Sequence, residues 1–261
     1  MSPCLPDVPD RVLAYAAAVT EALTAASGGS LHASYLHGSA VLGGWQPGSD
    51  VDMLFVAADN ASGSTLKRMA AVLADRSDQA GGCPGRGLEC SIVTATAAAT
   101  PSAPWPYLLH AVAEPGGCLI QDGADTPGDP DLLMHYAVCR AAGHALTGSP
   151  PRDIIGPVPR QAILGYLADE LDWGLGHATE AYAVLNACRA LVFLADDAIV
   201  SKIAGGDAAL DRGFGPAELI MRALSQQRGC AGVQQPEADA AEFVLAAAGA
   251  LREACGLNCP P

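Results

Sequence analysis

The sequence predicts an α+β protein, with a small mixed sheet flanked by helices in its N-terminal part and helices alone in its C-terminal part. Three short apolar runs have the character of core strands: residues 31–36, 51–56 and 88–95. A dense run of prolines, glycines and serines follows at 147–159, and beyond it the apolar spacing is helical throughout. We therefore expect two domains, residues 1–156 and residues 157–261.

The expected helices are those with apolar residues at helical spacing. The first ends at the turn signal Ser27-Gly28-Gly29, and a later one begins near Asp131. Residues 96–130 are rich in alanine, proline and glycine, so we expect a loop-rich segment with one strand near 118–120. In chain order the expected helices span 10–25, 39–44, 64–74, 131–145, 160–173, 178–196, 216–226 and 237–254.

The composition excludes several classes of protein. With 261 residues, half of them hydrophobic, the chain can bury a core without disulfides, and no apolar run is long enough to span a bilayer. The net charge of −14 argues against a nucleic-acid partner. The nine cysteines form no Cys-x-x-Cys pair, which argues against structural zinc and a disulfide framework. The N-terminus lacks a signal-peptide pattern, so we expect the protein to stay in the cytoplasm. We also expect a monomer without a membrane partner.

Two acids begin the second predicted strand. Asp50 and Asp52 are two residues apart, so on a strand they would point to the same face, roughly 6.5 Å apart. Two like charges beside an apolar run are costly unless a cation neutralises them, and carboxylate oxygens suit Mg²⁺ that also binds a polyphosphate. The alternative is a solvated turn.

The first predicted strand ends at Gly38-Ser39, about ten residues before these acids. Gly38 allows the backbone to approach a ligand closely, and Ser39 adds a hydroxyl and an amide donor at the start of an expected helix. This combination is typical of phosphate-binding sites.

The third predicted strand carries a single acid, Glu89, in an otherwise apolar and β-branched run. We expect Glu89 to face the aspartate pair from a neighbouring strand. The alternative is an acid at the strand edge that points into solvent.

The pattern Gly38-Ser39 followed by Asp50-Val51-Asp52 resembles the nucleotidyltransferase superfamily related to DNA polymerase beta. Three C-terminal runs, at 155–159, 183–191 and 199–202, resemble the helical domain of the aminoglycoside 3″- and 9-adenylyltransferases. The resemblance implies a nucleotidyltransferase domain over residues 1–156 and a C-terminal helical domain over residues 157–261.

The resemblance also implies an activity, the transfer of AMP from ATP to a hydroxyl of an aminoglycoside or aminocyclitol antibiotic. Asp50 and Asp52 would hold two Mg²⁺ ions, and Glu89 would be the general base or a further metal ligand. ATP and a small cationic substrate would lie in a cleft between the domains. The implied phosphate-binding residues are Gly38, Ser39, Ser49, Arg189 and Lys202.

Arg189 also stands out without the resemblance, because it lies in an apolar helical segment where an unpaired cation would be expensive. Lys202 follows that helix and could reach the same site. The alternative for Arg189 is an ion pair within the domain, with Asp196, Asp197 or Glu180 as partner.

The acceptor side matches the family less well. Enzymes of this family that modify streptomycin have a tryptophan after the third strand and an acid early in the helix that carries the arginine. Here the acid's position is Thr179, next to Glu180, and the only tryptophan in the loop region is Trp105. The sequence therefore favours spectinomycin over streptomycin. Three acids could line the cleft of a cationic drug, although solvation of a helix face also explains them: Asp169, Glu170 and Asp172.

Two other functions stay open from the sequence. One is nucleotidyl transfer to a different hydroxyl, on a metabolite or a protein. The other is nucleotide binding without catalysis, against which the three acids speak. The lone histidines His135 and His144 are assigned no ligand role.

Overall fold

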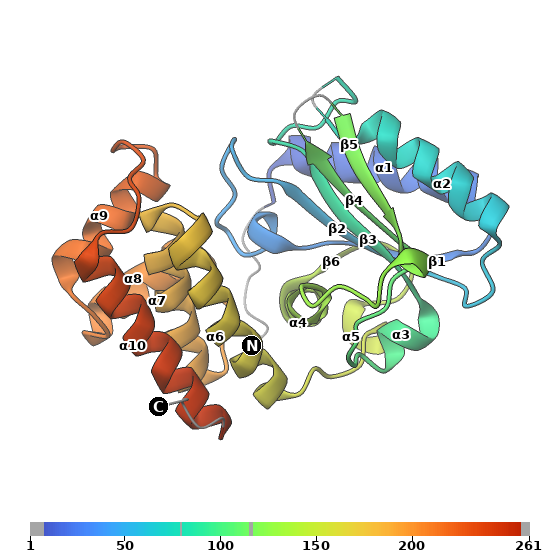
Figure 1. Ribbon diagram of the computed structural model, residues 1–261. Coiled ribbons are helices and arrows are strands. Elements are labelled where there is room, and N and C mark those ends of the chain that lie inside the picture. The colour runs from blue at the N-terminus through green and yellow to red at the C-terminus, as the bar shows by residue number, and fades with distance from the viewer. Residues whose placement is uncertain (1–7, 79, 115–116, 257–261) are drawn as a thin grey trace. The chain divides into compact units, whose positions relative to one another are not determined.

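The structure, a computed structural model, describes residues 8–78, 80–114 and 117–256 (Figure 1). The packing of its Cα atoms divides the chain into two units, one ending at Val158 and the other beginning at Pro159. The first unit combines a sheet with helices, whereas the described residues of the second form helices and loops. The α+β class expected from the sequence is confirmed.

The N-terminal unit is built on one six-stranded sheet with the order β5-β4-β3-β2-β1-β6. β2 and β3 run parallel, and every other neighbouring pair is antiparallel, so the sheet is mixed as expected. The strands are β1 (Leu31–Leu36), β2 (Val51–Ala57), β3 (Leu88–Thr94), β4 (Leu109–Glu114), β5 (Gly117–Asp122) and β6 (His144–Thr147).

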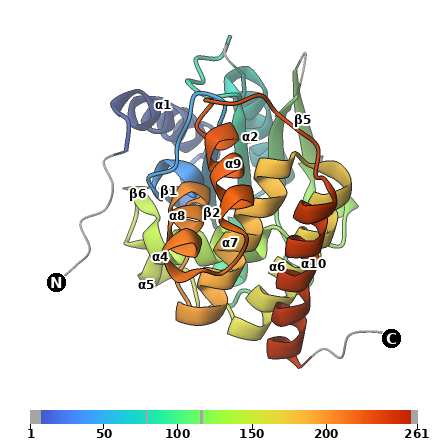
Figure 2. The same cartoon turned by 90° about the vertical axis from the view of Figure 1, so that its left-hand side faces the viewer.

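Helices cover both faces of this sheet (Figures 1 and 2). Met53 and Phe55 of β2 pack in one core with residues of α1 and α2, and Leu54 and Val56 pack in a second core with residues of α4. Because side chains alternate along a strand, Asp52 shares the α4 face with Leu54. The helices are α1 (Asp10–Ser27), α2 (Gly63–Arg76), α3 (Ala95–Ala99), α4 (Leu132–Ala142) and α5 (Pro151–Ile154), with 3₁₀ turns η1 (Gly38–Ala40) and η2 (Gly123–Asp125).

Some sequence predictions for this unit were wrong. The helix expected at 39–44 is only the 3₁₀ turn η1 followed by further turns, because Gly43, with φ +72°, interrupts it. The helix expected to reach residue 145 ends at Ala142, and the next residues join β1 as β6. β4 was missed inside the loop-rich segment, because its alanines give little strand signal. It forms a strand because it pairs with β3 on one side and β5 on the other.

The helical unit is organised around α7, which packs against each of the other four helices. α8 was not predicted, because two adjacent glycines, Gly205 and Gly206, weaken its helical signal. A Cβ at Gly205 would lie 2.7 Å from Cγ of Arg189 on α7, so the small residue allows the two helices to approach closely. The five helices are α6 (Arg160–His177), α7 (Glu180–Asp196), α8 (Lys202–Arg212), α9 (Ala217–Gln227) and α10 (Ala238–Cys255).

Two further findings concern the cysteines and the helices. The seven cysteines within the described ranges are free thiols, and Cys4 and Cys259 lie outside these ranges. In the same ranges, no helix combines the length and apolarity needed to cross a bilayer.

Glu180, in the first turn of α7, ties α7 to α9 in the helical unit. Its side chain is fully buried and accepts hydrogen bonds from Nε and Nη2 of Arg222, at 2.7 and 2.9 Å, and from Nε2 of Gln226 at 3.1 Å. A buried carboxylate paired in this way is costly to neutralise, because a charge-assisted pair of hydrogen bonds from Arg222 is weakened.

We predict that Glu180→Gln lowers the free energy of unfolding of the helical unit by about 2–3 kcal/mol, since Arg222 keeps only Asp239 as a charged partner. Urea unfolding followed by circular dichroism measures this. Glu218→Gln is the matched control, because it makes the same change at an exposed position on α9, with an expected loss below about 0.5 kcal/mol. Equal losses in the two variants would contradict the structural role given to Glu180.

Candidate active site

Asp52 and Glu89 lie side by side at the start of the two parallel strands. They are register partners in the β2/β3 ladder, where neighbouring strands are about 4.8 Å apart. Both side chains are partly buried, and that of Glu89 is 27% exposed. Since each is an even number of residues from the α4-facing side chains of its strand, both carboxylates lie on the α4 face of the sheet.

Gly38 lies directly beneath the carboxylate of Asp52. The backbone N–H of His37 donates to the carbonyl of Asp52 at 2.9 Å, which brings the end of β1 against β2. Gly38 has φ +66°, and a Cβ there would lie 1.8 Å from Oδ2 of Asp52. Only glycine fits, so the chain closes tightly around this carboxylate.

The two predicted phosphate-binding serines differ in their surroundings. Oγ of Ser39 is buried and has no hydrogen-bond partner in the described part of the chain, so it is available to a ligand. Oγ of Ser49 accepts from the N–H of Gln46 at 3.0 Å, and the N–H of Ser49 donates back to the Gln46 carbonyl at 2.8 Å. Ser49 therefore closes the turn that leads into β2.

Asp50 precedes β2 and is held by Arg86, in the loop before β3. Nε of Arg86 donates to Oδ1 of Asp50 at 2.9 Å, and Nη2 donates to Oδ2. These hydrogen bonds raise the pKa of Arg86, and the nearby charges of Glu89 and Asp52 act in the same direction. Arg86 was not recognised from the sequence. It lies two residues before β3, and the parallel pairing of β3 with β2 brings this segment beside the one that precedes β2.

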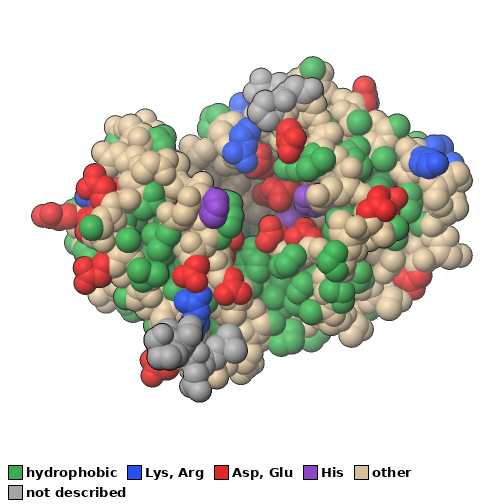
Figure 3. Space-filling view, in the orientation of Figure 1, with side chains coloured by type: hydrophobic (Ala, Val, Ile, Leu, Met, Phe, Trp, Pro, Cys, Tyr) green, Lys and Arg blue, Asp and Glu red, His purple; other side chains and the backbone are tan. Residues whose placement is uncertain are grey.

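Two histidines border the carboxylates. Nε2 of His135, on α4, lies 3.8 Å from Oε1 of Glu89, and the rings of His135 and His37 are 4.9 Å apart between centroids. Burial lowers the pKa of His37 well below its usual value, and His135 adds to this, so His37 is neutral at physiological pH. Nε2 of His37 and Nδ1 of His135 are buried without hydrogen-bond partners among the described residues. Sequence analysis gave His135 no role. Acidic and histidine side chains lie together on this face of the unit (Figure 3).

The three predicted metal ligands differ in how well they are placed to bind a divalent cation. Asp52 and Glu89 provide adjacent carboxylates, the oxygen donors that Mg²⁺ prefers. Both oxygens of Asp50 accept hydrogen bonds from Arg86. Accordingly, residues 8–78, 80–114 and 117–256 contain no group of three or more carboxylate, imidazole or thiol side chains placed to hold a metal.

In the helical unit, Arg189 takes part in a polar network on α7. Its Nε donates to the carbonyl of Val200 at 2.9 Å, and its Nη1 donates to Oδ1 of Asn186 at 3.0 Å. The acids considered as its partners are each bound by another arginine: Asp196 by Arg212, Asp197 by Arg160 and Glu180 by Arg222.

Lys202 is the first residue of α8 and belongs to the same network. Its Nζ lies 4.1 Å from the ring centroid of Tyr182, a cation–π contact. The Tyr182 hydroxyl donates to Glu170, and burial and Glu170 raise the pKa of Tyr182. Asn186 bonds to both Tyr182 and Arg189, so it connects the two predicted phosphate-binding cations.

The residues considered for the acceptor have mainly structural contacts. Thr179 caps α7 by accepting from the N–H of Tyr182 at 3.3 Å. Trp105 packs against the α4-side core of the sheet. Asp172 pairs with Arg252, which also lies 3.7 Å from Asp169.

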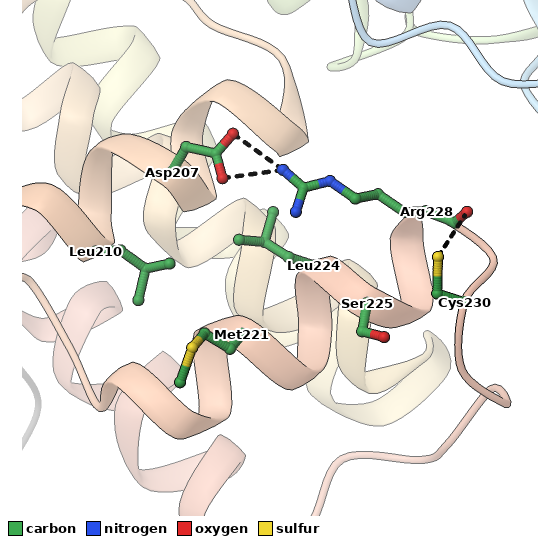
Figure 4. Close-up of a pocket in the computed structure, with 7 residues that line it drawn as sticks. All are labelled: Asp207, Leu210, Met221, Leu224, Ser225, Arg228 and Cys230. Atoms are coloured by element: carbon green, nitrogen blue, oxygen red, sulfur yellow. Dashed lines mark hydrogen bonds and ion pairs between the residues drawn. The ribbon is translucent and has the colours of Figure 1, made fainter.

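A surface pocket of about 270 Å³ opens between α8 and α9 of the helical unit (Figure 4). Its lining combines apolar side chains such as Met221 with the Asp207–Arg228 ion pair and the exposed Cys230. It contains none of the predicted site residues, and its charged groups already satisfy each other, so we assign it no role.

The comparisons with known proteins bear first on the helical unit. Residues 153–252 match the family described as aminoglycoside adenylyltransferase, C-terminal domain. This match covers most of the helical unit and less than half of the chain. The family expected from the sequence is thereby confirmed for the C-terminal part of the chain. No curated protein matches the sequence closely enough to name as a relative.

One matching solved structure is that of spectinomycin adenyltransferase AAD(9) from Enterococcus faecialis, described as crystallised with ATP and spectinomycin. The match has a TM-score of 0.64 and covers 94% of this chain and 100% of that chain, at 16% sequence identity. At this identity the match shows a shared fold. Because it covers 94% of this chain, the shared fold includes both the helical unit and the unit that contains the sheet.

We predict that Gly38→Ala destabilises the N-terminal unit more than Gly29→Ala does. Gly29 has φ +90° and open space around a new Cβ, so alanine there costs only backbone strain, about 1–2 kcal/mol. Gly38→Ala adds the clash with Asp52, and we expect a further loss of about 1–3 kcal/mol in urea unfolding. Equal losses would show that the Asp52 carboxylate can move away without cost.

Proposed function

We propose that this protein is an adenylyltransferase that moves AMP from ATP to a hydroxyl of an aminoglycoside or aminocyclitol antibiotic, with release of pyrophosphate. Spectinomycin is the favoured acceptor. The single observation that carries the proposal is the adjacency of Asp52 and Glu89 above Gly38. The family of the helical unit and the fold shared with a spectinomycin adenyltransferase support the choice of reaction.

Glu89 is the proposed general base. Its carboxylate takes the proton from the acceptor hydroxyl while the hydroxyl oxygen forms a bond to the α-phosphorus of ATP. The bond between the α-phosphorus and the oxygen that bridges to the β-phosphate breaks, and pyrophosphate leaves with that oxygen. A base positioned in this way contributes roughly 10²- to 10⁴-fold in rate.

Asp52 and Glu89, joined by Asp50 when Arg86 releases it, would hold Mg²⁺. The cation would supply positive charge that offsets the charge of the triphosphate. In the alternative assignment for Glu89, its carboxylate serves only as a metal ligand, and the acceptor proton passes to solvent.

The phosphates would be held from both units. Ser39 offers a buried hydroxyl that has no hydrogen-bond partner among the described residues, next to Gly38, which has no side chain. Ser49 would contribute after opening its turn with Gln46. Arg189 and Lys202 would neutralise the β- and γ-phosphates, and their shared contacts through Tyr182 and Asn186 hold the two cations together.

Two observations support spectinomycin over streptomycin. At the position where enzymes that accept streptomycin have an acid, this chain has Thr179, which caps α7. The neighbouring Glu180 is bound by Arg222, so it does not replace that acid. We propose a monomer acting in the cytoplasm, where ATP is available, and the net charge of −14 suits a cationic acceptor better than nucleic acid.

The proposal is tested by incubating the full-length protein with ATP, Mg²⁺ and single antibiotics, and by mass spectrometry for addition of AMP. We expect addition to spectinomycin and none to streptomycin. Addition only to another hydroxyl compound or to a protein would replace the acceptor. ATP binding without any transfer would point to a protein that has lost catalysis.

We predict that Glu89→Gln lowers kcat by roughly 10²- to 10⁴-fold while ATP still binds, because the amide cannot accept the proton. Glu114→Gln, which makes the same change at the exposed end of β4, should keep wild-type kcat. If Glu89 is only a metal ligand, the loss will instead fall on the apparent affinity for Mg²⁺. Wild-type kinetics in Glu89→Gln would remove this residue from the mechanism.

A further inference from the structure

Arg86 binds Asp50 although the loop around it does not need this contact. The backbone holds the loop: the N–H of Arg86 donates to the Ser49 carbonyl at 2.9 Å, and the N–H of Val51 donates to the Gly87 carbonyl at 2.8 Å. The Arg86 side chain is 71% exposed and ends in the paired hydrogen bonds to Asp50. Its guanidinium can therefore leave Asp50 without unfolding the loop.

The Arg86 guanidinium is also near the other two carboxylates of the proposed site. We call the three acids Asp50, Asp52 and Glu89 the acidic edge. The hydrogen bonds and charge of Asp50 make the largest contribution to the raised pKa of Arg86, and the negative charges of Glu89 and Asp52 add to it. Asp52 and Glu89 are adjacent like charges and Asp50 lies two residues before Asp52, so a bound cation relieves part of the repulsion among them. In the structure Arg86 is this cation. It donates to both oxygens of Asp50, which are the atoms that a metal ion would bind.

Two buried polar atoms near Asp52 are left unsatisfied by the described residues, which is a sign of a polar ligand. Oγ of Ser39 and Nε2 of the fully buried His37 make no hydrogen bond within the described residues. Such atoms are normally satisfied, so they mark a place prepared for a polar ligand beside Asp52.

We propose that Arg86 is an exchangeable counter-ion: it holds Asp50 while the site lacks a divalent cation, and the cation displaces it. This inference rests on the proposed function for the identity of the cation. Because the cation must compete with Arg86 for Asp50, Arg86 weakens binding of the free cation. The strength of an exposed ion pair corresponds to a loss of cation affinity of about twofold to fivefold.

The test uses the full-length protein without nucleotide or antibiotic, and Mn²⁺ as the probe, with free Mn²⁺ measured by electron paramagnetic resonance. Arg86→Gln should bind Mn²⁺ about twofold to fivefold more tightly than the wild type. Arg76→Gln is the control for net charge, because Arg76 pairs with Asp75 on α2 rather than with the edge, and it should change the affinity less than twofold. In an Asp50→Asn background, Arg86→Gln should have no larger effect than this control.

Unchanged or weaker Mn²⁺ binding in Arg86→Gln would overturn the proposal, as would absence of Mn²⁺ binding in both proteins. A second measurement does not depend on a variant's stability: the Nε–H resonance of Arg86 in the wild type should shift on titration with Mg²⁺. No shift at saturating Mg²⁺ would also overturn it. These results are separate from the transfer assay, so an active enzyme with no Arg86 effect refutes only this inference.

Discussion

The parallel pairing of β2 with β3 is the constraint on which the candidate site depends. It places Asp52 directly beside Glu89, although the two residues are 37 positions apart in the chain. The same pairing brings the segments just before the strands together, so Arg86 meets Asp50. A shift of this register by one residue would turn one of the two carboxylates to the opposite face of the sheet. The strand register therefore determines that the two carboxylates are neighbours on one face of the sheet, whatever rotamers they adopt.

The sequence was most informative where single residues conflict with their surroundings. Acids at the start of apolar strands, and a Gly-Ser pair at the end of another, predicted a common site, and Asp52, Glu89 and Gly38 do meet there. Arg86 and His135 could not be recognised, because each is an ordinary residue in its own segment. Arg86 becomes important only through the β2/β3 pairing, and His135 only because α4 packs on the Glu89 face.

The errors in the fold prediction have a similar origin. β4 and β6 are stabilised by their neighbours in the sheet rather than by their own residues, and α8 forms despite adjacent glycines because Gly205 lets it approach α7. Local propensity carried little information at these places. The helical unit as a class was recognisable from its periodicity and from a few short runs, and its family match agrees with that prediction.

In the proposed mechanism, Asp52 and Glu89 together bind the divalent cation that accompanies ATP. The most direct measurement is the anomalous scattering of Mn²⁺ in crystals of the full-length protein grown with Mn²⁺ and a non-hydrolysable ATP analogue. The account predicts an anomalous peak in contact with carboxylate oxygens of both Asp52 and Glu89. An ordered nucleotide whose Mn²⁺ contacts neither carboxylate would contradict it.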